Sequence, residues 1–433
     1  MTPRTEPATT LPPSPDLPGP VRNGPPELPR YAELEAYRGM AALLVVVFHA
    51  YQYTREGTGA GRYLYEGTPL HVLFYNLDTP VAWFYALSGF LLFMPYARSI
   101  MQGKAPQRGR WFLFRRAVRI LPLYLLAISV VWALRYGGQP GTWTDLLEHL
   151  TFTHVWDSRY IFYTIGPAWS LGNEVIFYAM LAIMGPALFR LTRQAGAADR
   201  RRWLLGFPLG LIALSVGYKL FMHLGLGLPA SGLAWFFNPF AHADTFGMGM
   251  LLASLAATGW AHTGAGARAA LQLTGVVLLA LTFVARLEEP VVRIFAFTLS
   301  GLAFSCVLAS TILARQPAGL ARTLNRPGWA TLGMMSYGLY LWHEPLMLEL
   351  AKHQVLIRPD PGAFWPNALV LTLVAGAVAA LTYSLVEAPA QQLRHLFTSD
   401  GRFRDGYAEA KAQYEREVAL ENAGRPGPQG DLG

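Results

Sequence analysis

Long apolar runs alternate with short polar segments along most of this chain. From Gly39 onward, runs of roughly 17 to 25 mainly apolar residues recur, which is the length a helix needs to cross about 30 Å of hydrocarbon. They lie at residues 39–54, 74–97, 115–134, 166–190, 203–222, 233–258, 269–286, 292–314, 330–351 and 363–386. The pattern predicts an all-α, polytopic membrane helical bundle with about ten transmembrane helices.

The two ends of the chain differ from this middle region. Residues 1–32 are rich in proline, which breaks helices, so we expect a disordered cytoplasmic tail there. Residues 393–433 are polar and charged and predict a second cytoplasmic tail. We therefore expect residues 33–392 to form one transmembrane domain.

Composition supports a membrane protein. Hydrophobic residues make up 53% of the chain and charged residues 14%, whereas a soluble domain carries about 25% charged residues. This excludes an intrinsically disordered protein and argues against one large soluble domain, because too few polar side chains remain for its exterior. The single cysteine, Cys306, excludes a cysteine-based zinc site. His149, His154 and Asp157 are spaced roughly as metal ligands, but no H-E-x-x-H motif accompanies them, and we expect no metal.

The distribution of Lys and Arg explains the formal net charge of +8. The even-numbered loops between the predicted spans carry about twice as many basic residues as the odd-numbered loops, and basic loops favour the cytoplasm. This bias predicts that both termini are cytoplasmic. The orientation of the chain in the lipid bilayer therefore explains its positive charge, and we expect no nucleic-acid partner.

Ionisable side chains inside the predicted spans are costly in lipid and often functional. Arg38 and His49 are 11 residues apart, so they share one helix face about 16 Å from each other. A neutral histidine at that depth suits a general base, although a structural histidine gives the same pattern. In the fourth span Ser170, Glu174 and Tyr178 form a polar stripe at intervals of four. A buried carboxylate needs a partner, and His49 or an arginine is the natural candidate.

Other polar positions have two interpretations each. Tyr340 and His343, with Tyr337 beside them, form either a polar stripe in the ninth span or part of an aromatic belt at the membrane interface. Asp244 in the sixth span is either a functional carboxylate or a structural one. Ser88, followed by glycine, indicates close helix packing first and a reactive serine second.

The basic run of Arg115, Arg116 and Arg119 also has two interpretations. The preference of basic residues for the cytoplasmic side explains arginines at this height. Three arginines within five residues can equally bind the phosphates of a cytoplasmic cofactor. The glycine-rich motifs of common nucleotide-binding proteins do not occur in the sequence.

Six blocks of the sequence resemble the acyltransferase-3 family of bacterial integral-membrane O-acyltransferases. The first is Arg38 with ten residues before His49, and the others follow in family order at 84–90, 116–119, 169–178, 336–343 and 386–389. Together they cover about residues 33–392. The resemblance implies a multi-pass protein of the bacterial inner membrane that moves an acyl group, often acetyl, from cytoplasmic acyl-coenzyme A to a hydroxyl group. Acceptors in the family include surface polysaccharides, lipopolysaccharide, peptidoglycan and antibiotics such as macrolides.

The resemblance also implies roles for individual residues. Arg38, His49 and Glu174 would belong to the catalytic core, and Arg116 and Arg119 would bind acyl-coenzyme A. We expect His49 to remove the proton of the acceptor hydroxyl as it attacks the thioester, with Glu174 orienting the imidazole. A two-step route through an acyl-enzyme is a variant of this chemistry.

Hydrogen-bond donors to the developing oxyanion are expected from Tyr340, Ser88 or Trp169. A secondary transporter is the main alternative function, because transporters also bury Arg, His and Glu along a pathway. A non-catalytic membrane scaffold is the third. The sequence leaves open the identity of the saccharide or glycoside acceptor, the acyl chain, the side from which the acceptor enters and the oligomeric state.

Overall fold

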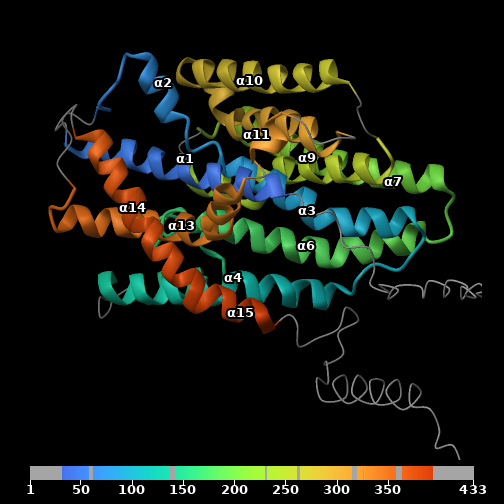
Figure 1. Cartoon of the computed structure of the whole chain (residues 1–433), viewed down its shortest axis with the longest axis horizontal. Coiled ribbons are helices and arrows are strands. Elements are labelled where there is room, and N and C mark those ends of the chain that lie inside the picture. The colour runs from blue at the N-terminus through green and yellow to red at the C-terminus, as the bar shows by residue number, and fades with distance from the viewer. Residues whose placement is uncertain are drawn as a thin grey trace, which may run out of the picture. The chain divides into compact units, whose positions relative to one another are not determined.

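The computed structural model describes residues 32–57, 62–136, 142–229, 232–260, 264–314, 319–324, 326–356 and 363–393. These residues form helices and contain no β-strand, which confirms the all-α prediction (Figure 1). The two predicted tails lie almost entirely outside the described residues.

Each predicted span shares most of its residues with one long helix. These helices are α1 (Ala32–Gly57), α3 (Val81–Met101), α4 (Gly109–Tyr136), α6 (Ala168–Thr192), α7 (Ala197–Leu220), α9 (Pro239–Ala257), α10 (Ala265–Glu288), α11 (Pro290–Ile312), α13 (Pro327–Lys352) and α14 (Phe364–Thr382). Seven helices of the described chain are long and apolar enough to cross a membrane, and α3, α9 and α13 are not among them. Candidate membrane-spanning helices are therefore present in the described chain, while their exact number and the cytoplasmic location of the termini stay predictions.

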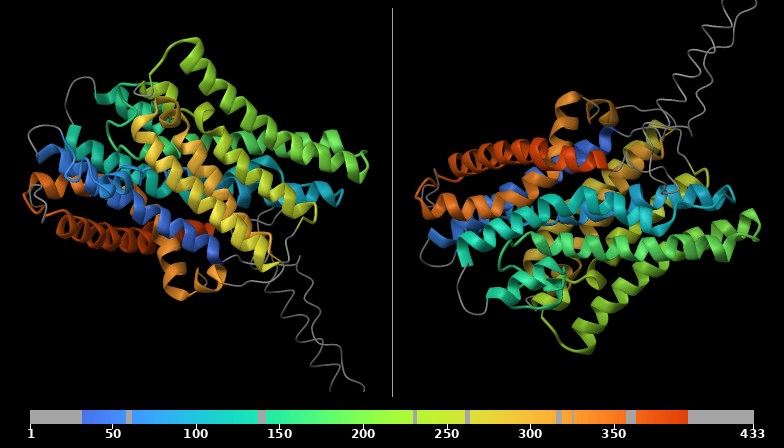
Figure 2. Two further views of the ribbon diagram at one scale, coloured as in Figure 1. Left: turned by 90° about the horizontal axis from the view of Figure 1, so that it is seen from above. Right: turned by 90° about the horizontal axis from the view of Figure 1, so that it is seen from below.

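Short helices join the long ones. They are α2 (Pro69–Tyr75), α5 (Thr142–Leu150), η1 (His154–Trp156), α8 (Leu233–Phe237), α12 (Leu320–Leu324) and α15 (Ala388–Gln392), with the π-helical turns η2 (Phe221–Gly225) and η3 (Tyr383–Glu387). Helices α1, α13 and α14 pack against one another, as both views of Figure 2 show. A second layer is formed by α3 and α9, which contact each other along most of their length.

Glycines allow these helices to approach backbone to backbone. A Cβ on Gly249 of α9 would lie 1.9 Å from the carbonyl oxygen of Ala86, and one on Gly89 would meet the α9 backbone almost as closely. A Cβ on Gly333 of α13 would lie 2.2 Å from the α1 backbone. The expected close packing beside Ser88 is therefore present between α3 and α9, and a second close approach holds α13 against α1.

Candidate active site

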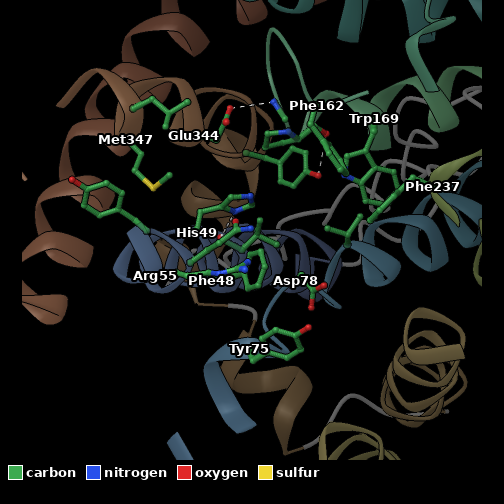
Figure 3. Close-up of a pocket in the computed structure, with 18 of the residues that line it drawn as sticks. Phe48, His49, Arg55, Tyr75, Asp78, Phe162, Trp169, Phe237, Glu344 and Met347 are labelled. Atoms are coloured by element: carbon green, nitrogen blue, oxygen red, sulfur yellow. Dashed lines mark hydrogen bonds between the residues drawn. The ribbon is translucent and has the colours of Figure 1, made fainter. Parts of the chain in front are cut away.

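A cavity of about 830 Å³ lies among α1, α6, α8 and α13 (Figure 3). We call it the outer cavity, because the predicted orientation of the helices places it toward the outer face of the membrane. Side chains from α1, including His49, form one wall, and α13 contributes Tyr340, Glu344 and Met347. Trp169, at the start of α6, closes another side.

His49 has His343 as its partner in this cavity. Nδ1 of His49 lies 3.0 Å from the carbonyl oxygen of Val45 and 3.1 Å from Nε2 of His343. Because a carbonyl oxygen only accepts, His49 Nδ1 carries the hydrogen and His343 Nε2 accepts from it. His343 donates from Nδ1 to the carbonyl oxygen of Leu339 at 3.3 Å. This network assigns the tautomer in which Nε2 of His49 holds a lone pair.

Glu174 lies elsewhere, and the expected contact between Glu174 and His49 is not formed. The Glu174 carboxylate accepts hydrogen bonds from the hydroxyl groups of Ser88 at 2.6 Å and Tyr178 at 2.5 Å. Glu174 follows Trp169 by five residues on α6, which places it about 7.5 Å further along the helix axis. His343 therefore occupies the place beside His49 that the sequence suggested for Glu174.

A second, small cavity surrounds Glu174, and we call it the inner cavity. Its cationic lining consists of Arg38 from α1 with Arg116 and Arg119 from α4, which we call the arginine cluster. All three side chains are half-buried. Arg115 does not line this cavity. Helical spacing explains why Arg116 and Arg119 line the same cavity, since they are three residues apart and share a face of α4.

One layer of side chains separates the two cavities. Tyr340 lines the outer cavity and Tyr337 the inner one, one helical turn apart on α13. The hydroxyl groups of Tyr340 and Ser170 lie 2.8 Å apart, and both contact the carbonyl oxygen of Pro167. Tyr337 donates to the carbonyl oxygen of Ile120 at 2.9 Å. The arginine cluster and His49 thus lie at neighbouring levels of the bundle with this polar layer between them.

Asp244 lines neither cavity, so its expected role beside the substrate has no geometric support. Its carboxylate forms a buried ion pair with Lys219 of α7 at 2.6 Å and accepts from the hydroxyl of Thr298 at 2.6 Å. Both charged side chains are almost fully inaccessible to solvent. Asp244 is therefore paired and hydrogen-bonded within the helix layer formed by α7, α9 and α11, as a buried charge requires.

The histidines of α5 and η1, His149 and His154, form a stacked pair. The rings of His149 and His154 lie 4.1 Å apart, and Nδ1 of His149 lies 3.0 Å from the carboxylate of Asp145. Burial, followed by the charge of His149, lowers the pKa of His154 to about 3. Asp157 pairs instead with Arg159, whose hydrogen bonds lower the pKa of Asp157. Among the described residues no group of three such side chains is arranged to hold a metal ion.

Four charged residues of the outer cavity, Arg55, Asp78, Arg286 and Glu344, were not among the candidates drawn from the sequence. Asp78 and Arg286 form a salt bridge on its wall, and Glu344 accepts from the backbone N–H of Gly166 at 3.1 Å. Asp78 and Arg286 lie near the ends of their predicted spans, where charges are ordinarily explained by the membrane surface. Glu344 directly follows His343, and that adjacency was the available signal.

Most of the helical region is similar in sequence to known proteins. A family model described as an acyltransferase domain matches residues 31–386. The chain is 25% identical over 372 residues to a protein of Komagataeibacter xylinus that is named as a membrane-bound transacylase, BcsY, with 83% of this chain and 82% of that protein covered. It is 30% identical over 185 residues to protein 2 in the picA locus of Rhizobium radiobacter, covering 38% of this chain and 86% of that protein. No solved structure matches the chain at a significant level.

Proposed function

Because this chain belongs to that acyltransferase family, we propose that it moves an acyl group, with acetyl expected, from acyl-coenzyme A to a hydroxyl group of a saccharide or glycoside. We place this membrane-bound acyltransferase in the bacterial inner membrane, where its cytoplasmic face meets coenzyme A. What supports the proposal is that three arginines line the inner cavity while His49, with a lone pair on Nε2, lines the outer one. Tyr337 and Tyr340, one helical turn apart on α13, line one cavity each.

The arginine cluster suits the anionic end of the donor. Arginine binds phosphate oxygens bidentately, and three guanidinium groups together match the phosphates of acyl-coenzyme A. The narrow arm of the donor would then pass the layer of Tyr340 and Ser170 and carry the thioester to His49. Glu174, which holds the hydroxyl groups of Ser88 and Tyr178, would balance the positive charge of the inner cavity.

His49 would act as the general base. Its Nε2 takes the proton as the acceptor oxygen bonds to the thioester carbon, and the C–S bond then breaks with return of that proton to the departing thiolate. Nδ1–H keeps the carbonyl oxygen of Val45 and Nε2 of His343 as acceptors throughout, which stabilises the transient imidazolium. Of the expected oxyanion donors, Trp169 and Tyr340 line this cavity, whereas Ser88 is bound to Glu174 in the inner one.

The His49–His343 contact predicts a positioning role for His343. Replacement of His343 by Leu removes one of the two acceptors of His49 Nδ1–H and leaves the Val45 carbonyl as the other. We expect kcat to fall about 10- to 100-fold, because the imidazole is held less firmly in its orientation. The donor KM should stay near its wild-type value. His343→Gln keeps an acceptor in the side chain and should recover part of the rate. Equal damage in both variants, or a change confined to KM, would contradict this role.

Acyl transfer by the purified protein tests the proposed function. Detergent-solubilised protein would receive radiolabelled acetyl-coenzyme A and a panel of glycans and glycosides, and the label on each acceptor would be counted. We expect label on at least one acceptor in proportion to enzyme. If coenzyme A is neither bound nor consumed, the proposal is wrong, and accumulation of a solute in vesicles without the donor would favour a transporter.

A further inference from the structure

A salt bridge on the wall of the outer cavity has no role in the proton transfer proposed above. Arg286, from the last turn of α10, donates from Nη1 and Nη2 to the two carboxylate oxygens of Asp78 at 2.6 and 2.8 Å. In Figure 3, Asp78 lies beside Tyr75 on one side of His49, and Glu344 lies on the other. Asp78 and Arg286 therefore line the same cavity as His49, and they pair with each other.

The surroundings hold this salt bridge in one geometry. The Arg286 guanidinium carbon lies 5.2 Å from the ring centre of Tyr75 and 5.9 Å from that of Phe297. Nη1 of Arg286 also donates to Oδ1 of Asn76 at 3.3 Å. Asn76 is itself fixed, because its amide donates to the carbonyl oxygens of two residues on different helices. A bidentate pair fixed in this way is prepared for a ligand before the ligand arrives.

Asp78 retains the capacity to bind hydroxyl groups. An ionised carboxylate offers about four acceptor positions, and Arg286 occupies two of them. The Asp78 side chain is 20% exposed, whereas that of Arg286 is 8% exposed. The group of this pair that a ligand reaches first is therefore an acceptor, which matches the O–H donors of a sugar ring.

The remaining wall provides aromatic surface. Trp169, Phe237, Phe297 and Tyr75 all line the outer cavity, and its volume lies in the range of about 300 to 1,000 Å³ that small-molecule sites have. Aromatic faces bury apolar surface such as the C–H face of a pyranose ring. Ring stacking beside a fixed carboxylate favours a cyclic polyol over a linear alcohol.

The charges of the cavity balance. Its lining holds the two guanidinium groups of Arg55 and Arg286 and the two carboxylates of Asp78 and Glu344. The charge of Arg286 is directed at Asp78, so an anionic ligand that approaches this pair meets the more exposed carboxylate first. We therefore expect the cavity to bind a neutral ring more tightly than an acidic one.

We propose that the Asp78–Arg286 pair is the acceptor-recognition element of the outer cavity and that it selects a neutral pyranose ring over its uronic-acid counterpart. The inference rests on the proposed function for its biological meaning. Asp78 would accept from ring hydroxyl groups, the aromatic wall would contact the ring face, and a further hydroxyl would be directed toward His49.

Binding of two matched probes tests this selection without any need for transfer. The probes are 4-nitrophenyl β-glucoside and 4-nitrophenyl β-glucuronide, with affinities measured by equilibrium dialysis against the full-length, detergent-solubilised protein. We expect the wild type to bind the neutral probe more tightly. Asp78→Asn removes the acceptor and releases the charge of Arg286, so the ratio of the two affinities should move toward the acidic probe by about 10-fold or more, the effect of one charge-assisted hydrogen bond.

Matched variants separate selection from damage to the fold. Asp244→Asn breaks the buried pair with Lys219, which lines neither cavity, and should leave the affinity ratio unchanged. Should Asp78→Asn fail to fold, Asp78→Asn combined with Arg286→Gln removes both charges and should lose the preference altogether. Equal binding of both probes by the wild type, binding of neither, or an unchanged ratio in the Asp78 variants would overturn the inference.

The two proposals fail in different ways. Acyl transfer by the wild type without a preference for the neutral probe refutes the recognition element alone. A preference that Asp78→Asn reverses, in a protein that never consumes acetyl-coenzyme A, refutes the proposed function alone.

Discussion

His49→Ala should abolish measurable acyl transfer, with kcat falling by about 10²- to 10⁴-fold, the range that a general base contributes. The reason is geometric, because Nε2 of His49 is the nitrogen left without a hydrogen by the contacts of Nδ1 with Val45 and His343. No other side chain on α1 offers a lone pair of similar basicity to the outer cavity. The rate should be measured as label transferred from radiolabelled acetyl-coenzyme A under saturating donor.

The control for this variant is a histidine of the same helix bundle that lies away from both cavities. His353 at the end of α13 pairs with Glu349 and is exposed, so His353→Ala should keep the wild-type rate. Donor affinity should be equal in the wild type and in His49→Ala, since the arginine cluster is unchanged. Near-normal transfer by His49→Ala would show that the base lies elsewhere.

Loss of the arginine cluster should act on donor binding instead of on the chemical step. We expect Arg116→Ala with Arg119→Ala to raise the KM for acetyl-coenzyme A by about 100-fold or more, because each charge-assisted hydrogen bond to a phosphate contributes roughly 1.5–3 kcal/mol. Initial rates over a range of donor concentrations would separate KM from kcat. The acceptor KM should change little, since the acceptor occupies the other cavity.

Arg115 supplies a matched control for the cluster. It carries the same charge at the neighbouring position of α4 but does not line the inner cavity. Arg115→Ala should therefore alter the donor KM far less than Arg116→Ala does. An equal effect of all three substitutions would mean that the arginines act through the membrane-surface charge, as the alternative interpretation of this basic run holds.

Helix periodicity identified most of the architecture, because side-chain spacing along one helix is a local property. Each of the ten apolar runs contains most of one long helix, although the runs at 74–97 and 233–258 also include residues of the short helices α2 and α8. The face shared by Arg38 and His49 follows from their spacing on α1. Arg38 and His49 line different cavities. Their spacing of 11 residues already implies this, because a helix rises 1.5 Å per residue and the two side chains are therefore about 16 Å apart.

Partners across helices could not be derived from local pattern. Glu174 was expected beside His49, yet the partner of His49 comes from α13, nearly three hundred residues away in the chain. The same limit applies to Asp78, whose partner Arg286 lies on α10. Polar residues inside apolar runs can be found from one sequence, but which of them meet depends on helix packing that periodicity does not encode.

In the proposed reaction the donor reaches His49 from the inner cavity and the acceptor reaches it from the outer one. Proteoliposomes that trap radiolabelled acetyl-coenzyme A inside, with an impermeant glycoside acceptor only outside, test it directly against vesicles that hold both substrates on one side. We expect labelled acceptor when the substrates lie on opposite sides of the membrane. Label that appears only when both lie on the same side would contradict it.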